Sequence, residues 1–113
     1  MAAPIIVFAN AELDQHSTPE WHPERPGRLA ASLSGIAVAG LLDAVEFRNP
    51  RLATVAELER VHSPAYVAQL ERFCESGGGD LDPDTFAAPG SWDTALRAAG
   101  AVLDAVEALE AGS

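Results

Sequence analysis

The stretch Ile5-Ile6-Val7-Phe8 decides the fold class of this 113-residue chain. It is a short, continuous apolar run in which three of the four residues are β-branched. Such a run is typical of a strand that is covered on both faces in a parallel sheet. A second strand is predicted at Val45-Glu46-Phe47, where apolar and polar residues alternate before Asn49 and Pro50 end it. Together the two runs predict an α/β protein with a short parallel sheet of about two strands.

About four helices are predicted around these strands. Pro26 fits the first turn of a helix, because the N–H that proline lacks is not needed there. Thr54 and Glu57 have the spacing of a capping box, and Ser63 followed by Pro64 is a second helix start. The predicted helices cover residues 26–40, 54–61, 63–77 and 91–109.

The last of these helices carries the broadest apolar stripe, and Ser91 is predicted to cap it. The prolines in the segment Asn10 to Pro26 prevent a continuous helix, so a long ordered loop is expected there. The segment Asp80 to Gly90 has no hydrophobic period and is predicted to be a surface loop held by turn chemistry. Two strands are fewer than the roughly four to six of a typical sheet, which indicates an incomplete sheet.

The charge balance narrows the classes of partner. The chain has 17 acidic and 7 basic residues, and its net charge is −10. Nucleic-acid-binding proteins concentrate positive charge to displace counterions, and the sequence has no basic cluster, so DNA and RNA are excluded as direct partners. The acidity favours a cationic ligand, although acidic surfaces mostly serve solubility.

The single cysteine, Cys74, excludes an internal disulfide and is typical of a reducing compartment. It lies on the apolar face of a predicted helix, which favours burial over a nucleophilic role. The opening run lacks the basic segment of a signal peptide, and no apolar stretch is long enough to cross a bilayer. We therefore expect a cytoplasmic protein that does not bind membranes.

Three segments, taken in order, resemble a known family. They are 21–29 (Trp-His-Pro-Glu-Arg-Pro-Gly-Arg-Leu), 61–67 (Val-His-Ser-Pro-Ala-Tyr-Val), and 82–85 (Asp-Pro-Asp-Thr) leading to 89–92 (Pro-Gly-Ser-Trp). Their order and separation are similar to the N-terminal third of zinc-dependent deacetylases of the histone deacetylase and acetylpolyamine amidohydrolase superfamily, bacterial and class II-like. The resemblance implies that residues 1–113 form a single N-terminal segment of a deacetylase domain.

In that family the fold is arginase-like, with a parallel sheet between helices in three layers and a zinc site on loops at the carboxyl ends of the strands. The resemblance therefore implies a partial version of this fold. The family's zinc ligands, its tandem histidine pair and its carbonyl-polarising residue all come later in the sequence. His16, His22 and His62 are the only histidines here, and none are spaced as paired ligands. We expect no catalytic residue and no metal site in this chain, and zinc only in the full-length family.

The resemblance assigns five residues to the rim or channel of the active site. Arg28 matches an arginine beside the passage thought to release acetate, although it could instead bond loop carbonyls. Asp84, or alternatively Asp82, falls where the family has a rim carboxylate, and either could be a turn-forming aspartate. His22 and Glu24 match the first active-site loop, where ordering the loop is the favoured role.

Two functions follow. The chain is either a part of a zinc deacetylase that hydrolyses acetyl-lysine or acetylpolyamine amides, inactive alone, or a free-standing, non-enzymatic module that oligomerises or binds a small ligand. In the first case the partner in the full enzyme is a cationic acetylated substrate. In both cases the open sheet edge and apolar stripe predict self-association into a dimer or higher oligomer.

Overall fold

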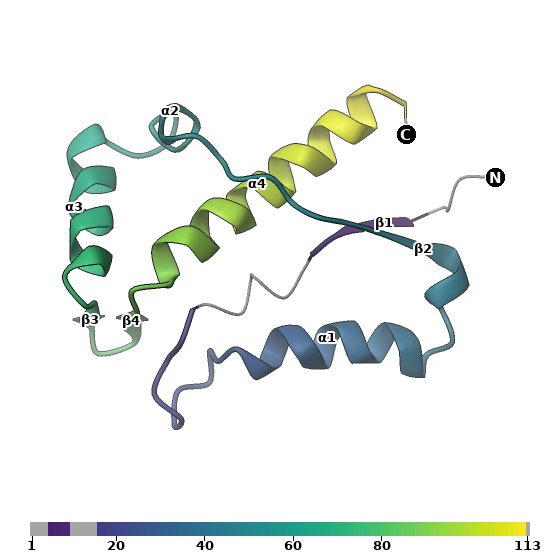
Figure 1. Cartoon of the computed structure of the whole chain (residues 1–113), viewed down its shortest axis with the longest axis horizontal. Coiled ribbons are helices and arrows are strands. Elements are labelled where there is room, and N and C mark those ends of the chain that lie inside the picture. The colour runs from purple at the N-terminus through teal and green to yellow at the C-terminus, as the bar shows by residue number, and fades with distance from the viewer. Residues whose placement is uncertain (1–4, 10–15, 113) are drawn as a thin grey trace.

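The computed structural model describes residues 5–9 and 16–112. The two predicted strands are present as β1 (Ile5–Phe8) and β2 (Val45–Arg48), and they pair in parallel with Ile5 opposite Val45. Figure 1 shows this sheet between helix α1 (Gly27–Val38) and the C-terminal half of helix α4 (Ser91–Glu110). The α/β class and the short parallel sheet are confirmed. Residues 10–15 of the predicted long loop lie outside the described residues.

Local capping signals place the short helices where the sequence predicted them. Helix α2 (Val55–Leu58) starts with a complete capping box, because Thr54 and Glu57 each bond the other's backbone N–H. Helix α3 (Pro64–Glu75) starts with the Ser63 hydroxyl accepting a bond from the N–H of Tyr66. A 3-10 turn, η2 (Leu42–Ala44), leads into β2.

The segment predicted to be a loop, Asp80 to Gly90, instead contains an antiparallel hairpin. Strands β3 (Gly79–Asp82) and β4 (Thr85–Ala87) pair with Gly79 opposite Ala87. The register is irregular between Asp80 and Asp82. The two strands have only four and three residues, so any alternation of apolar and polar residues is too short to reveal them in the sequence.

Ser91 is not the cap of α4, as the sequence predicted. The N-cap position is occupied by Gly90, and Ser91 is the first helical residue. Its hydroxyl accepts a bond from the N–H of Ala88 at 2.8 Å, which ties the end of the hairpin to the start of α4. Helix α2 also ends at Leu58, three residues before the predicted Val61.

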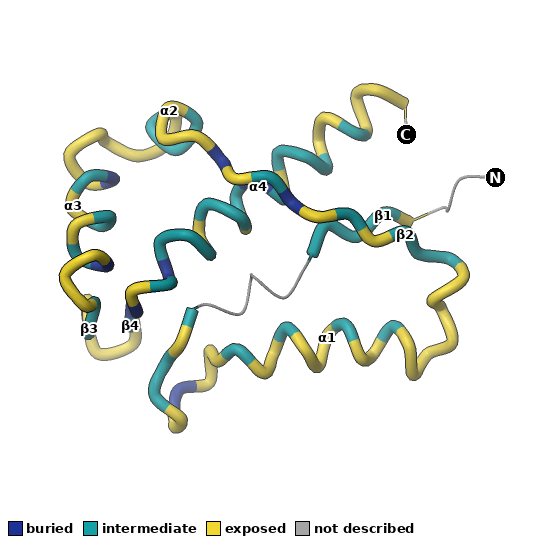
Figure 2. Tube along the Cα trace, in the orientation of Figure 1, coloured by how far each residue is buried: buried dark blue, intermediate teal, exposed yellow. Residues whose placement is uncertain are grey.

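The buried core is small and lies where α3, the hairpin and α4 meet, with further burial at Pro50 and Ala53 on the segment that crosses α4 (Figure 2). Its apolar members are Ala53, Val67, Cys74, Ala87 and Ala88. Cys74 is 1% exposed, as predicted for a small buried hydrophobe, and its burial raises the pKa of the thiol. A thiol held in the protonated form is a poor nucleophile.

Helix α4 is fixed to the segment between β2 and α2 by polar contacts. The backbone of this segment approaches the backbone of α4 closely, because the N–H of Ala53 donates to the Leu96 carbonyl at 2.9 Å. The guanidinium of Arg51 bonds both carboxylate oxygens of Glu57 at 2.9 Å each. The same guanidinium pairs with two carboxylates of α4, Glu107 at 3.0 Å and Asp104 at 3.4 Å. One arginine therefore joins α2 to α4.

This cluster predicts a pH dependence of stability. The bond from Arg51 lowers the pKa of Glu57 from 4.5 to about 2. Because the folded state prefers the ionised carboxylate, its stabilisation is fully present above pH 4.5 and is lost as the pH falls towards 2. We expect Arg51→Met to lower the urea midpoint at neutral pH and to flatten its fall across that window. Arg60→Met, at an exposed position, is the control. An unchanged pH profile in Arg51→Met would contradict this role.

The protein exposes more surface than a compact monomer of its mass. Its accessible surface is 7360 Å², whereas about 5,900 Å² is typical of a folded monomer of this size. Its radius of gyration is 15.8 Å, compared with about 13 Å for a compact chain of this length. Within residues 5–9 and 16–112, no helix has both the length and the apolar character needed to cross a bilayer.

Candidate functional site

The five residues that the resemblance assigned to the rim or channel lie in one connected network. They come from two segments far apart in the sequence: the loop leading into α1 and the β3–β4 hairpin. The links run in the order Asp82, Asp84, His22, Glu24 and Arg28. The sequence identified the members, but only the tertiary structure brings the two segments together.

His22 is the centre of this network and is 9% exposed. Its Nδ1 accepts a bond from the backbone N–H of Glu24 at 3.0 Å, so the ring proton is on Nε2. Nε2 then donates to the backbone carbonyl of Asp84 at 2.8 Å, across 62 residues of sequence. The exposed ring of Trp21 lies beside it, with ring centroids 5.5 Å apart.

The two aspartates of the hairpin have different environments. The carboxylate of Asp82 accepts a bond from the backbone N–H of Asp84 at 2.8 Å, which closes the turn through Pro83. This is the turn-forming use of aspartate. The backbone N–H and the carbonyl of Asp84 are both hydrogen-bonded. Asp84 is an exposed residue at the tip of the hairpin.

Arg28 pairs with Glu24, four residues earlier, at 3.3 Å, and both side chains are more than half exposed. An exposed pair of this kind adds little to stability. It does orient the guanidinium, because the carboxylate of Glu24 holds one of its two terminal nitrogens. Among the described residues, no loop carbonyl is a partner of the Arg28 side chain.

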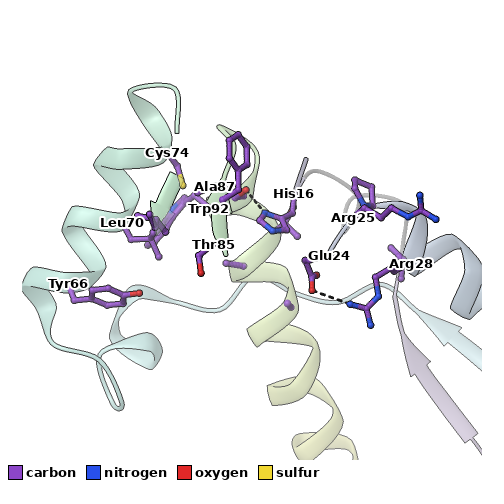
Figure 3. A pocket seen from close by; sticks show the side chains of 18 residues that line it. His16, Glu24, Arg25, Arg28, Tyr66, Leu70, Cys74, Thr85, Ala87 and Trp92 are labelled. Carbon is purple, nitrogen blue, oxygen red and sulfur yellow. Dashed lines mark hydrogen bonds and ion pairs between the residues drawn. The ribbon is translucent and has the colours of Figure 1, made fainter. Parts of the chain in front are cut away.

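Arg28 and Glu24 also line a pocket of about 460 Å³ between the start of α1, α3, the hairpin and the first turns of α4 (Figure 3). Its walls are mainly apolar, and they include Leu70, Cys74 and Trp92. Thr94 also lines the pocket. Its hydroxyl oxygen is buried and has no hydrogen-bond partner in the described part of the chain. Charged groups at one side and apolar walls elsewhere suit a small ligand with a polar end.

His16 and Ser91 are site residues that the sequence analysis missed. Their side chains line the same pocket, and His16 Nδ1 is 2.6 Å from Ser91 Oγ (Figure 3). The contact joins residues 75 positions apart, so no local pattern could reveal it. The sequence instead predicts a cap at Ser91, because Ser91 stands directly before an apolar helix.

Zinc does not fit the residues present. Across the residues that the structure describes, no cluster of three or more His, Cys, Asp and Glu side chains could hold a metal ion. The three histidines have other neighbours: His16 bonds Ser91, His22 bonds Asp84, and the His62 ring lies 5.5 Å from that of Tyr66. Activating water at a metal needs three or four converging ligands, and the described residues bring no such set together.

Comparison with known proteins gives a consistent assignment. Residues 22–113 match the family model described as the histone deacetylase domain. A probable deacetylase of Methanothermobacter thermautotrophicus is 38% identical over 109 residues, which are 96% of this chain and 32% of that protein. A histone deacetylase-like amidohydrolase of Pseudomonas aeruginosa is 32% identical over 91 residues, which are 80% of this chain and 24% of that protein.

A solved structure, the crystal structure of the HDA15 HD domain, superposes with a TM-score of 0.86 at 28% sequence identity. The match covers 99% of this chain and 33% of that one. The chain thus spans about a third or less of the length of the relatives it matches.

Proposed function

The chain belongs to the histone deacetylase family, and we propose that it supplies the substrate rim and channel loops of a zinc-dependent amide hydrolase. It is inactive alone, because the groups that hold zinc and move the proton belong to the remaining two thirds of the domain. Zinc held by that remainder would lower the pKa of a bound water molecule and so activate it. The residues of this chain orient the substrate.

The connected network is the observation that carries this proposal. Asp84 presents an exposed carboxylate from a hairpin whose backbone is held at both of its polar groups. A carboxylate at a rim can accept hydrogen bonds from the backbone N–H groups of a peptide, and it attracts a cationic substrate. The net charge of −10 acts in the same direction on acetylated lysine-rich peptides or acetylpolyamines.

The test compares the chain alone with a completed domain. We expect no deacetylation of an acetyl-lysine peptide and no stoichiometric zinc uptake by the 113-residue chain. A chimera in which residues 1–113 replace the matching segment of the Methanothermobacter relative should bind zinc and hydrolyse the peptide. In that chimera, Asp84→Asn should raise KM about tenfold, the scale of one charge-assisted hydrogen bond.

Asp80→Asn is the matched control, because it removes the same charge from the same hairpin at another exposed position. Its KM should stay close to that of the parent chimera. Equal effects of the two substitutions on KM would show that net charge, and not the position of Asp84, affects substrate binding. Deacetylation by the isolated chain would refute the proposal that the catalytic groups belong to the rest of the domain.

A second candidate, self-association, is favoured by the exposed surface. The accessible area exceeds that of a compact monomer by roughly 1,500 Å², and a stable interface needs only about 800 Å² from each partner. Apolar side chains repeat along one stripe of α4, where Val102 is 65%, Val106 48% and Leu109 74% exposed. We propose that a second copy of the chain covers this stripe when the rest of the domain is absent.

Light scattering over a wide concentration range should therefore give a mass above that of the 11.8 kDa monomer. Val102→Glu combined with Leu109→Glu should shift the isolated chain to the monomer, because charges cannot be buried against an apolar partner without large cost. Val38→Glu on α1, at a residue that is 85% exposed, is the control and should leave the mass unchanged. A monomer at every concentration would exclude this candidate.

A further inference from the structure

We infer that His22 is a positioning residue that fixes the rim carboxylate of Asp84 through the protein backbone, and this inference rests on the function proposed above. His22 lies in the loop before α1, and Asp84 lies at the tip of the β3–β4 hairpin. The two are connected by a single bond, from Nε2 of His22 to the carbonyl oxygen of Asp84, at 2.8 Å. Within residues 5–9 and 16–112, no other hydrogen bond of His22 reaches the hairpin.

The bond that Nδ1 of His22 makes determines that Nε2 donates to the hairpin. Nδ1 accepts the backbone N–H of Glu24 at 3.0 Å, which leaves the proton on Nε2 and aims it at the hairpin. The ring is 9% exposed, so water competes little for either bond. Both bonds need the tautomer with the proton on Nε2. The side chain of His22 thereby connects the loop before α1 to the tip of the β3–β4 hairpin.

At the hairpin, the bond from His22 completes the restraint of Asp84. The carboxylate of Asp82 already holds the backbone N–H of Asp84, at 2.8 Å. With the carbonyl held as well, the backbone of Asp84 is fixed on both sides of its Cα atom, and the direction of its Cα–Cβ bond is fixed with it. In the described part of the chain, the carboxylate of Asp84 bonds no other side chain and remains available to a substrate.

Hydrogen-bond geometry allows the two bonds of His22 to be separated by substitution. The amide nitrogen of His22→Gln reaches the position of Nε2 and can still donate to Asp84. The amide oxygen of His22→Asn reaches the position of Nδ1 and can still accept from Glu24, but nothing then reaches the hairpin. His62→Ala, which removes a histidine that contacts Tyr66 rather than the hairpin, is the control.

The first measurement uses the 113-residue chain and nitrogen relaxation of its backbone amides. His22→Asn and His22→Ala should increase the motion of residues 83–85, whereas His22→Gln and His62→Ala should leave it as in the parent. Nitrogen shifts of the parent ring should show the Nε2-protonated tautomer. Unchanged order of the hairpin tip in His22→Ala would overturn the inference without reference to any activity.

The second measurement uses the deacetylase chimera described above. His22→Asn should raise KM for the acetyl-lysine peptide about tenfold with little change in kcat, and His22→Gln should restore it. Combined with Asp84→Asn, His22→Asn should add no further increase, because it acts only through Asp84. Additive effects would overturn the positioning role. If Asp84→Asn alone leaves KM unchanged, the proposed function of the rim fails instead.

Discussion

Replacing Gly100 with alanine is expected to lower the free energy of unfolding by about 3 kcal/mol, the upper part of the range for overpacked cores. Gly100 is buried in the middle of α4, where the helix crosses the segment between β2 and α2. A Cβ atom built there would lie 1.8 Å from the carbonyl oxygen of Arg51 and 3.0 Å from the backbone nitrogen of Ala53. Both neighbours are backbone atoms, so no side-chain rotation can relieve the overlap.

Relief requires α4 to move away from that segment, and this movement would also weaken the Ala53 to Leu96 backbone bond and the contacts of Arg51. Urea denaturation followed by circular dichroism measures the loss. Gly35→Ala in α1 is the matched control, because that glycine is also helical and has nothing within 4 Å of the added Cβ. It should stabilise the protein by up to about 1 kcal/mol, the difference in helix propensity. If Gly100→Ala proves as stable as the parent, the close crossing of α4 is wrong.

Replacing Gly78 with alanine is expected to cost about 3 kcal/mol and to release the β3–β4 hairpin. Gly78 has a φ of 74°, a left-handed conformation that costs an alanine roughly 1–2 kcal/mol. An added Cβ would also lie 2.0 Å from the carbonyl oxygen of Ala87 on strand β4. The substitution therefore combines backbone strain with a clash against the strand that carries the hairpin into α4.

Gly40→Ala separates these two causes. Gly40 has the same φ of 74° but nothing within 4 Å of the added Cβ, so it reports the backbone strain alone. We expect Gly78→Ala to lower the urea midpoint more than Gly40→Ala, and to speed hydrogen exchange in residues 79–87 selectively. Equal losses in the two variants would mean that the approach of Gly78 to Ala87 carries no cost. In the chimera, Gly78→Ala should also raise KM, because the rim carboxylate of Asp84 is on the released hairpin.

Several predictions that depended on neighbours in the sequence were confirmed. The apolar run at Ile5–Phe8 forms a strand, and the capping box at Thr54 and the Ser63-Pro64 start are both present. Cys74 is buried, and the family assignment made from three short motifs is supported by the match over residues 22–113. Each of these signals is local, because it depends on spacing, side-chain chemistry or dihedral preference within about one turn of helix or one strand.

The features that the sequence could not reveal all depend on contacts between distant segments. The hairpin at 79–87 has strands too short to show a period, and its tip is bonded by His22, 62 residues earlier than Asp84. The local sequence predicts a cap at Ser91, and only the tertiary structure shows that its side chain contacts His16, 75 residues earlier. The sequence by itself determined the main helices and the parallel strand pair, and it picked out the residues that the structure joins in one network. Only the tertiary structure decided how those residues connect, because a hydrogen bond or a steric clash depends on distances in space that local patterns do not encode.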